Sequence, residues 1–527
     1  MSRIAVASGL GRFALGLRRF CRTPLTVEAA RQAVLQRMAT RDQAFLALLE
    51  RAVYANPRSP YRALLRAAGC EAGDVRALVA REGVEGALQH LRAAGVYVRF
   101  EELKGLEPAV RGGQTFHFRP DDFDNPLVRP NIPSRSGGTR AQPARILIDL
   151  DEIEMMAANW TLWFEAHGWD RRPIVFATPE YPGIVSRQLL CAKRGTPYAR
   201  WFATGRGGSL AYRGVSAAVH WLARRATGTP RPERVPLADA WRIGEELARM
   251  AETGLPPCVI SSPSTAARVC LAMDERGQRL PGVAFVLGGE PFTEARKQTL
   301  GAVGAVGVPS FGMSEAGAVG AQCPQPAAVD DVHLYLDGVA MVTDPRTLRD
   351  GRTVDALLLT SLRPAARKML LNTEIGDYGR LESRRCECTF DALGYHARLS
   401  GIRSFQKLTG EGMTILGSDL YPVLEDVLPR RFGGAVGDYQ LVERQDERGL
   451  PRYQLLVSPR VGRIDDGAMI RLLLDELRPI RPPYRFMLDQ WSQAGVLEVR
   501  REQPIASDRG KVPPFRALGA PEPGRVP

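Results

Sequence analysis

Three cysteines and one histidine in the second half of the chain have the residue types of a metal site. Cys386 and Cys388 form a Cys-x-Cys pair, while nine residues separate Cys323 from His333. Four nitrogen and sulfur ligands, two of them nearly adjacent, suit a tetrahedral structural Zn²⁺ ion. Their spacing differs from that of a standard zinc finger, which leaves open the alternative of two surface thiols and a core histidine. We predict one structural zinc ion on these four side chains.

The chain on either side of the Cys-x-Cys pair has the residues of a binding turn and a movable joint. Gly376 and Asp377 predict a turn that presents a carboxylate, which can accept hydrogen bonds from sugar hydroxyls. Residues 398–403 (RLSGIR) predict a Gly/Arg/Ser joint that can rotate, and a second Gly-rich turn is expected at Gly410 and Gly412. These features predict a nucleotide-binding body joined to a mobile cap.

Two further features could contact phosphate. Residues 136–139 (SGGT) precede a β-branched run, and consecutive backbone N–H groups in such a loop can cradle phosphate oxygens. Ser136 and Thr139 would add hydroxyl donors beside Gly137. Gly-rich loops are also common as plain turns. Glu315 lies between small residues, where a carboxylate can face a metal-bound phosphate.

Strands alternating with helices must position these side chains. Short apolar runs predict three strands, and two longer segments between them have helical periodicity. The strands are expected within 173–179, 258–264 and 283–292, and the helices within 237–254 and 264–277. Such alternation predicts an α/β body with a largely parallel sheet. Gly288, Gly289 and Glu290 follow the third strand, and ligands in such bodies bind at the carboxyl ends of the strands.

The two ends of the chain complete this organisation. Apolar residues recur at helical spacing over 26–105, which predicts helices packed on the body. After the joint, a hairpin around Arg448-Gly449 and a helix over 464–480 predict a small α+β unit, and Lys511 lies on a loop near its end. The predicted parts are an N-terminal helical segment of the large domain (1–105), an α/β nucleotide- and acyl-binding body (106–400) and a small mobile cap (401–527).

Composition and charge limit the possible partners. The chain has 527 residues, 44% of them apolar and 24% charged, as expected for a globular protein of at least two domains. Its net charge of +13 suits polyanions such as ATP and coenzyme A, but equally a solvated basic surface. The basic residues are dispersed and no recognition helix is evident, which argues against nucleic acid. No apolar run reaches the roughly 20 residues that a membrane-spanning helix needs.

Cysteine usage and the N-terminus bear on location. Eight cysteines in a chain of this length do not form a disulfide framework, so a reducing compartment, the cytoplasm, is expected. The first 27 residues contain five arginines and no acid. They could form a transit peptide, a helix on a membrane surface or a plain basic start. The sequence leaves these alternatives and the oligomeric state open.

The order of the motifs resembles that of the adenylate-forming ligases. It runs from SGGTR (136–140) through GGEPF (288–292), FGMSEAG (311–317) and IGDYGRL (375–381) to the Gly/Arg joint and a late Gly-Lys. Within that superfamily the chain resembles the phenylacetate–coenzyme A ligase branch, which includes capsule-biosynthesis-type relatives. The resemblance covers most of the chain after about residue 125. Its fold would be a large α/β domain followed by a small mobile α+β domain.

The resemblance implies a reaction and a role for the late lysine. Such enzymes use ATP and Mg²⁺ to activate a carboxylic acid as an acyl-adenylate, and then transfer the acyl group to a thiol. Lys511 matches the lysine that reaches the reacting carboxylate and the α-phosphate. A fixed cation suits this reaction, because two anions must approach each other. Carrying Lys511 on a mobile cap would let it withdraw before the thiol enters.

The other motifs acquire binding roles from the same resemblance. Phe311 matches an aromatic residue that stacks on adenine, and Asp377 matches the carboxylate that holds the ribose hydroxyls. Ser314 matches a hydroxyl that contacts phosphate, and Glu315 matches a carboxylate for Mg²⁺. The Gly288–Glu290 segment matches one that lines the adenine and acyl pockets. Some members of the branch also have a cysteine cluster before the joint, as zinc binding here would require.

Two departures from the family pattern affect the expected chemistry. The phosphate loop lacks one of the usual hydroxyl residues and has Arg140 after Thr139. The joint lacks the acidic residues that usually follow its arginine, and it offers Arg398 and Arg403, of which we favour Arg403 as the ribose contact. Both departures bear on ATP turnover more than on nucleotide binding.

Three functions are therefore compared. The leading prediction is an acid–thiol ligase with coenzyme A as the acceptor and a small carboxylic acid as the substrate. The second is an adenylating enzyme that loads a carrier or partner protein, and the basic surface suits an acidic carrier equally well. The third is a degenerate member that binds nucleotide or acyl ligand without turnover, which the altered phosphate loop favours. The residues do not identify the acid.

Overall fold

The fold is described from a computed structural model. It describes residues 16–17, 19–128, 132–135, 145–179, 184–196, 198–205, 221, 224–225, 228–348, 353–405, 407–410, 413–462, 464–480, 482–506 and 512–517. Among the helices in these ranges, none combines the length and apolar character that a membrane crossing requires.

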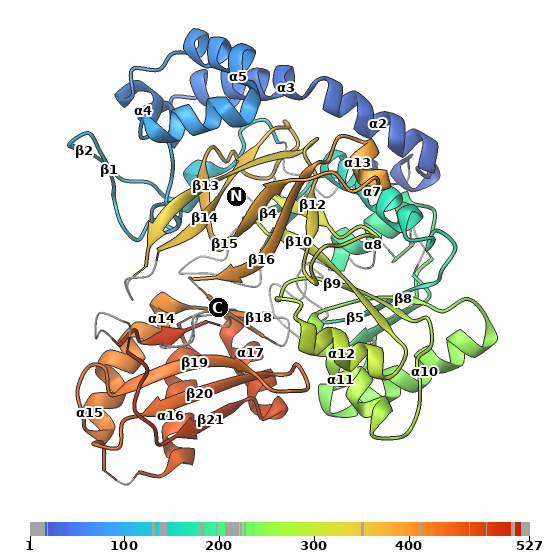
Figure 1. Cartoon of the computed structure of the whole chain (residues 1–527), viewed down its shortest axis with the longest axis vertical. Helices are drawn as coiled ribbons and strands as arrows, with labels where there is room; N and C mark the ends of the chain where they lie inside the picture. The colour runs from blue at the N-terminus through green and yellow to red at the C-terminus, as the bar shows by residue number, and fades with distance from the viewer. Residues whose placement is uncertain are drawn as a thin grey trace.

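A twelve-stranded sheet forms the centre of the large body (Figure 1). One half is parallel and contains β5 (Ile174–Thr178), β6 (Arg200–Ala203), β7 (Glu233–Arg234), β8 (Cys258–Ser261), β9 (Ala284–Leu287) and the start of β10 (Val306–Met313). β5, β8 and β9 are fully buried, as expected for a parallel sheet covered on both faces. These strands confirm the three predicted from apolar runs.

The other half of the sheet is antiparallel, which corrects the prediction of a largely parallel sheet. It contains β11 (Gly317–Ala321), β12 (Val332–Leu334), β13 (Val339–Thr347), β14 (Thr353–Ser361), β15 (Thr373–Ser383) and β16 (Ala397–Ser404). No long helical crossover separates these strands, and short connections can join only antiparallel neighbours. β10 belongs to both halves, because it pairs with β9 in parallel and then with β11 in antiparallel.

Helices cover the sheet, and their positions confirm the predicted α/β architecture. The body contributes α7 (Leu150–Ala166), α8 (Ile184–Lys193), α10 (Ala240–Thr253), α11 (Pro263–Asp274), α12 (Glu294–Ala302) and the short α13 (Thr389–Ala392). The predicted front piece contains α2 (Val27–Ala39), α3 (Arg41–Leu48), α4 (Pro60–Ala67), α5 (Ala72–Ala93) and α6 (Phe100–Leu103). It packs on the body, where the Tyr61 hydroxyl lies 2.6 Å from the Thr373 hydroxyl and the Val98 N–H donates to the Asn372 carbonyl. A small hairpin, β1 (Ala109–Arg111) and β2 (Gln114–Phe116), and the pair β3 (Ile132–Arg135) and β4 (Arg145–Ile148) complete this part.

The C-terminal part is a small α+β unit with its own core. Its sheet has the order β21 (Leu497–Arg500), β20 (Pro451–Val457), β19 (Tyr439–Gln445) and β22 (Phe515–Arg516). The remaining elements are a hairpin of β17 (Lys407–Gly410) and β18 (Met413–Leu416), and helices α14 (Gly417–Pro422), α15 (Leu428–Phe432), α16 (Asp466–Leu477) and α17 (Pro482–Ala494). Buried apolar residues between 408 and 515 form a separate cluster, in which Tyr453 stacks on Trp491 at 3.8 Å.

The predicted joint has a different structure from the one expected. Residues 398–403 lie within strand β16 of the large sheet, and Asp330 holds this strand by accepting hydrogen bonds from the Gly401 and Ile402 N–H groups at 3.0 and 3.2 Å. Strand β15 pairs with this segment along its length and β12 pairs with Arg398 and Leu399, so the segment is a strand of the large sheet and not a loop. The chain leaves the large sheet after Ser404, and we place the proposed boundary of the cap there.

The turn between β19 and β20 docks on the body beside α12. The Arg296 guanidinium, 2% exposed, donates to the Gly449 carbonyl at 2.8 Å, and the Thr299 hydroxyl donates to the Arg448 carbonyl at 2.7 Å. Gly449 has φ +80°, and a Cβ there would lie 2.7 Å from Arg296 Cγ. Backbone contacts therefore hold the α+β unit against the body in this arrangement.

A Gly449→Ala substitution tests this docking. It should lower the free energy of unfolding by about 2–4 kcal/mol, because left-handed backbone strain costs about 1–2 kcal/mol and the clash with Arg296 adds to it. Gly495→Ala is the matched control, since Gly495 has φ +59° with no atom within 4 Å of an added Cβ. Denaturant unfolding should rank the wild type first, Gly495→Ala second and Gly449→Ala last. Equal losses in the two variants would show that the docking adds nothing.

Candidate nucleotide site and metal centre

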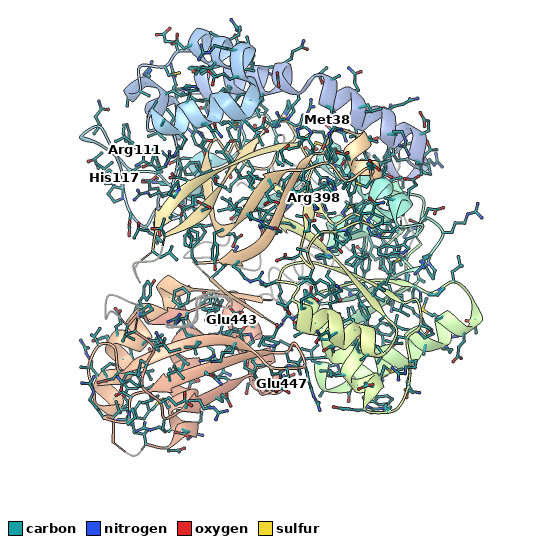
Figure 2. All side chains as sticks on the ribbon, in the orientation of Figure 1. Met38, Arg111, His117, Arg398, Glu443 and Glu447 are labelled. Atoms are coloured by element: carbon teal, nitrogen blue, oxygen red, sulfur yellow. The ribbon has the colours of Figure 1, made fainter. Side chains whose placement is uncertain are left out.

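An open cleft with an empty volume of about 780 Å³ lies at the carboxyl ends of β9 and β10. It brings together five predicted site residues from separate stretches of the chain, namely Gly289, Glu290, Phe311, Asp377 and Arg403. The α+β unit adds residues the sequence did not single out, including Glu443 on β19, on the side of that unit toward the large body (Figure 2). An aromatic ring, a carboxylate and a guanidinium around one cleft are the chemistry that a nucleotide requires.

Phe311 reaches the cleft because β10 changes partner there. The pairing of β10 with β11 shifts register between Phe311 and Gly312. A Cβ at Gly312 would lie 2.7 Å from the Gly317 carbonyl oxygen, so only glycine fits this approach. The sequence FGMSEAG therefore forms an irregular strand end whose ring remains partly exposed to the cleft.

Asp377 lies on a strand, which corrects the predicted Gly-Asp turn. Gly376 and Asp377 are within β15, and Asp377 is opposite Ser404 in the antiparallel ladder with β16. The Asp377 side chain is buried at the cleft wall, and its Oδ2 accepts a hydrogen bond from Lys407 Nζ at 3.2 Å. Lys407 belongs to the first strand after the joint, so a cap residue contacts the predicted ribose carboxylate. The sequence analysis did not identify Lys407. Its position shortly after the predicted joint was the one feature that could have marked it as a candidate site residue.

The two arginines of the joint have different positions. Arg403 lines the cleft, where its Nη1 donates to Asp330 Oδ2 at 3.0 Å. Arg398 is not among the cleft residues and is 2% exposed. Its Nε donates to Asp331 at 2.9 Å, and its Nη2 lies 3.8 Å from Cys323 Sγ. Arg403 therefore lies at the cleft, and Arg398 lies beside the Cys/His cluster.

Asp330 was missed although it supplies the acid that the joint lacks. It comes from the loop before β12, lines the cleft and contacts both the backbone and the arginine of β16. The signal in the sequence was an Asp-Asp pair directly ahead of a strand histidine. Only the pairing of β12 with β16 brings it to the joint, because about 70 residues separate the two segments.

The Glu290 carboxylate is anchored rather than free in the cleft. Ser264 donates to it from its hydroxyl at 2.7 Å and from its backbone N–H at 3.2 Å, and Arg296 pairs with it at 3.0 Å. The same arginine binds the Gly449 carbonyl of the docked turn. Glu290 thus connects the cleft wall with the contact between the body and the α+β unit. Gly288 precedes it, packed near the Ser310 hydroxyl.

Glu315 is already paired with a cation from the N-terminal helical segment. Lys104 Nζ lies 2.6 Å from Glu315 Oε1, and the two side chains are only 8% and 15% exposed. Burial alone would raise the pKa of Glu315, but Lys104 outweighs it and holds that pKa at about 2. Ser314 lies beside the pair, and its carbonyl accepts from Arg367 at 3.4 Å. This carboxylate does not fit the role of a metal ligand, since its charge is neutralised by a protein ammonium.

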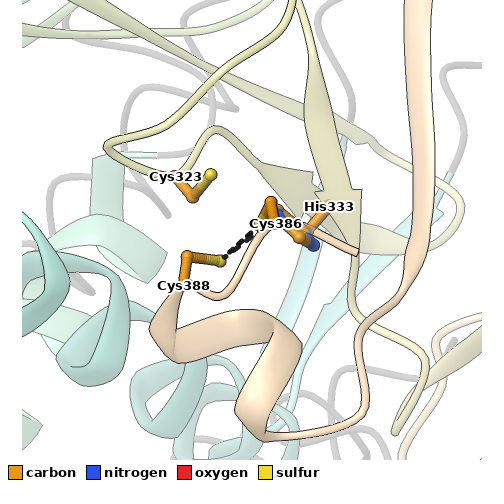
Figure 3. Close-up of side chains that lie close together, drawn as sticks. All are labelled: Cys323, His333, Cys386 and Cys388. Carbon is orange, nitrogen blue, oxygen red and sulfur yellow. Dashed lines mark hydrogen bonds between the residues drawn. The ribbon is translucent and has the colours of Figure 1, made fainter. Parts of the chain in front are cut away.

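The four predicted zinc ligands meet in one cluster (Figure 3). Their nitrogen and sulfur atoms all lie within 4.8 Å of one another. Cys386 Sγ is 3.1 Å from Cys388 Sγ and 3.3 Å from His333 Nε2. The ligands come from the loop after β11, from strand β12 and from the segment that leads into α13. Separations of this size let one ion of tetrahedral geometry contact all four atoms.

Groups behind the ligands prepare this cluster for a cation. His333 Nδ1 donates to the Tyr395 carbonyl, which leaves Nε2 with a lone pair directed at the three sulfurs. A hydrogen bond from the Cys388 thiol lowers the pKa of Cys323 against the effect of burial. Three thiolates and a divalent ion would have a net charge of −1, and the Arg398 guanidinium, which is also paired with Asp331, lies beside Cys323. The chemistry of the cluster therefore fits Zn²⁺.

Several predicted residues lie outside the described part of the chain. They are the phosphate-loop residues Ser136, Gly137 and Thr139, and the late lysine Lys511. The turn between β17 and β18, with Gly412, is also outside it. The roles given to these residues stay predictions.

Comparisons with known proteins find similarity in structure only. No protein-family model matches the chain, and no curated protein matches it in sequence. Among solved structures, a 2-hydroxyisobutyryl-CoA ligase bound to 2-HIB-AMP and CoA is 16% identical, over 91% of this chain and 90% of that one, with a TM-score of 0.46. An o-succinylbenzoate-CoA synthetase from Bacillus subtilis is 13% identical, over 65% and 61%, with a TM-score of 0.38. An amide bond synthetase from Marinactinospora thermotolerans is 15% identical, over 89% and 92%, with the same score. At these identities and scores, function is argued from the residues of this chain.

Proposed function

We propose that this protein is an ATP-dependent acid–thiol ligase, which activates a carboxylic acid as an acyl-adenylate and transfers the acyl group to coenzyme A. The observation that carries the proposal is the convergence on one cleft of Phe311, Asp377 and Arg403, which come from three separate motifs of the sequence. The cleft also lies against the α+β unit, as a reaction with a movable cap requires. The thiolate cluster suits a reducing compartment such as the cytoplasm.

Each cleft residue has a role in this proposal. The Phe311 ring would stack on adenine, and Asp377 would accept hydrogen bonds from the ribose hydroxyls. Lys407 occupies Oδ2 of that carboxylate, and among the described residues no hydrogen bond reaches Oδ1. Arg403, which lies on the neighbouring strand β16 and is held by Asp330, would hydrogen-bond the ribose beside Asp377. Lys511, brought by the cap, would stabilise the charge that develops when the substrate carboxylate attacks the α-phosphate.

The two metals have separate parts in this proposal. Zn²⁺ would be structural, because four protein ligands leave no open coordination position for a substrate. Mg²⁺ would neutralise phosphate charge and enter as the counter-ion of ATP. The Lys104–Glu315 pair lies at the segment expected to face the phosphates.

A pyrophosphate-release assay with a panel of carboxylic acids tests the proposal. Acid-dependent release of pyrophosphate and AMP would establish adenylation, and acyl transfer on addition of coenzyme A would identify the acceptor. If the acyl group is transferred only to a carrier protein, the acceptor is that carrier and not coenzyme A. Nucleotide binding without pyrophosphate release over a broad panel would instead indicate a non-catalytic binding protein.

Asp377→Ala tests the ribose contact. The variant should bind ATP and AMP about 10- to 100-fold more weakly, because it loses charge-assisted hydrogen bonds worth about 1.5–3 kcal/mol. Calorimetry of both nucleotides measures the effect. Glu382→Ala is the matched control, since Glu382 lies on the same strand with a side chain 44% exposed. Unchanged nucleotide affinity in Asp377→Ala would show that this carboxylate binds only Lys407 and does not contact the ribose.

A further inference from the structure

The Lys104–Glu315 pair connects the N-terminal helical segment with the FGMSEAG motif of the α/β body. Lys104 follows α6 in the N-terminal helical segment, which we predicted to pack on the body. Glu315 lies in the FGMSEAG segment between β10 and β11. The 2.6 Å contact is charge-assisted, and both partners are largely withdrawn from solvent. Lys104 is the C-cap residue of α6, and its Nζ lies 5.4 Å from the centre of the Phe100 ring.

Among the described residues, Glu152 is a second carboxylate beside this segment that is already paired with a cation. Its Oε1 lies 2.9 Å from the position of a Cβ on Gly317. It is bound by Arg367 at 2.6 Å, and the same arginine donates to the Ser314 carbonyl. Glu315 and Glu152 therefore each have a protein cation. A divalent ion on Glu315 would have to displace Lys104 or lie against its ammonium, where like charges repel.

We infer that Lys104 supplies the positive charge at Glu315, in place of a protein-held divalent metal ion. Glu315 then acts as a positioning residue that orients the ammonium toward the phosphate end of the site, and Mg²⁺ binds only through the nucleotide. The inference rests on the proposed function for the phosphate contact. The occupancy of Glu315 by Lys104 does not depend on it.

Two measurements on the full-length protein test this inference separately. The first is Mn²⁺ titration by electron paramagnetic resonance without nucleotide, in the wild type and in Glu315→Gln. The two titrations should coincide, because Lys104 excludes the metal from Glu315. A wild-type Mn²⁺ site that Glu315→Gln abolishes would overturn the inference. This measurement needs no catalytic activity, so it stands even if the protein proves not to be a ligase.

The second measurement compares ATP and AMP binding with and without Mg²⁺. Lys104→Met should weaken ATP binding about ten-fold or more in the absence of Mg²⁺, with less than about two-fold change for AMP, because only ATP has the outer phosphates. Lys104→Arg should retain most of the ATP affinity. Equal losses for ATP and AMP, or no loss for either, would overturn the phosphate contact and leave a purely structural pair.

Two controls separate these effects from misfolding. Lys193→Met removes another buried lysine, whose Nζ lies 2.9 Å from Glu154 Oε1. Lys193 is not among the cleft residues, so this variant should bind ATP and AMP as the wild type does. Lys104→Met leaves the Glu315 carboxylate without its partner. The neutral double variant Lys104→Met/Glu315→Gln is therefore measured beside it and should show the same selective loss of metal-free ATP binding. A double variant with wild-type ATP affinity would contradict the inference.

Discussion

Lys511→Ala is expected to slow acyl-adenylate formation by about two to three orders of magnitude, the usual loss for one transition-state charge donor. A carboxylate attacking a phosphoryl group needs a fixed cation, and Lys511 follows Gly510 in the sequence of the proposed cap. ATP binding should remain nearly intact, since the ammonium acts mainly in the transition state. Acid-dependent pyrophosphate release in single-turnover conditions measures the effect, once a substrate acid is known.

The second half-reaction provides the internal control for Lys511. Transfer from a supplied acyl-adenylate to the thiol should proceed at the wild-type rate, because the proposed cap would have withdrawn the lysine before this step. Lys297→Ala is the matched surface control, as its side chain is 61% exposed on α12. If neither half-reaction is slowed, Lys511 is a surface lysine without a catalytic role. Equal slowing of both half-reactions would indicate a folding defect.

Removing the predicted zinc ion is expected to lower the free energy of unfolding by about 5 kcal/mol or more. Structural zinc contributes about 10–16 kcal/mol in small peptides, and the effect should be smaller here because a hydrophobic core also stabilises the fold. Elemental analysis of the purified protein should find one zinc per chain. Cys388→Ser and strong chelators should both lower the melting temperature, and activity per folded molecule should change much less.

A cysteine outside the cluster serves as the control for the zinc prediction. Cys70→Ser changes a partly exposed thiol in the N-terminal segment and should leave the zinc content unchanged. The prediction would be wrong if the purified protein contained no zinc while Cys386 and Cys388 reacted freely with thiol reagents. The close grouping of the three sulfurs and His333 Nε2 would then be a feature of packing only.

The fold class was predictable because its signals are local. Apolar runs of four to five residues ended by Pro, Ser or Gly predicted β5, β8 and β9, and helical spacing predicted α10, α11 and α16. Both patterns follow from the two-residue period of a strand and the 3.6-residue period of a helix. The antiparallel half of the sheet was not foreseen, because strand direction depends on connections and pairing partners. The Gly376-Asp377 turn was predicted wrongly, since a Gly-Asp pair in sequence does not reveal that β16 pairs with it.

Local sequence patterns were enough to identify the residue types of the candidate site: the four Cys/His ligands, the carboxylate of Asp377 and the aromatic ring of Phe311. Their spacing lies within short stretches, so it can be recognised without knowing any tertiary contact. The pairing of the charges is visible only in the fold. The fold places Lys407 on Asp377, Lys104 on Glu315, and Arg398 beside Cys323 instead of in the cleft. The residues of these pairs are 30 to 211 positions apart in the sequence. No sequence pattern relates two charged residues at such separations, so their pairing could not be predicted.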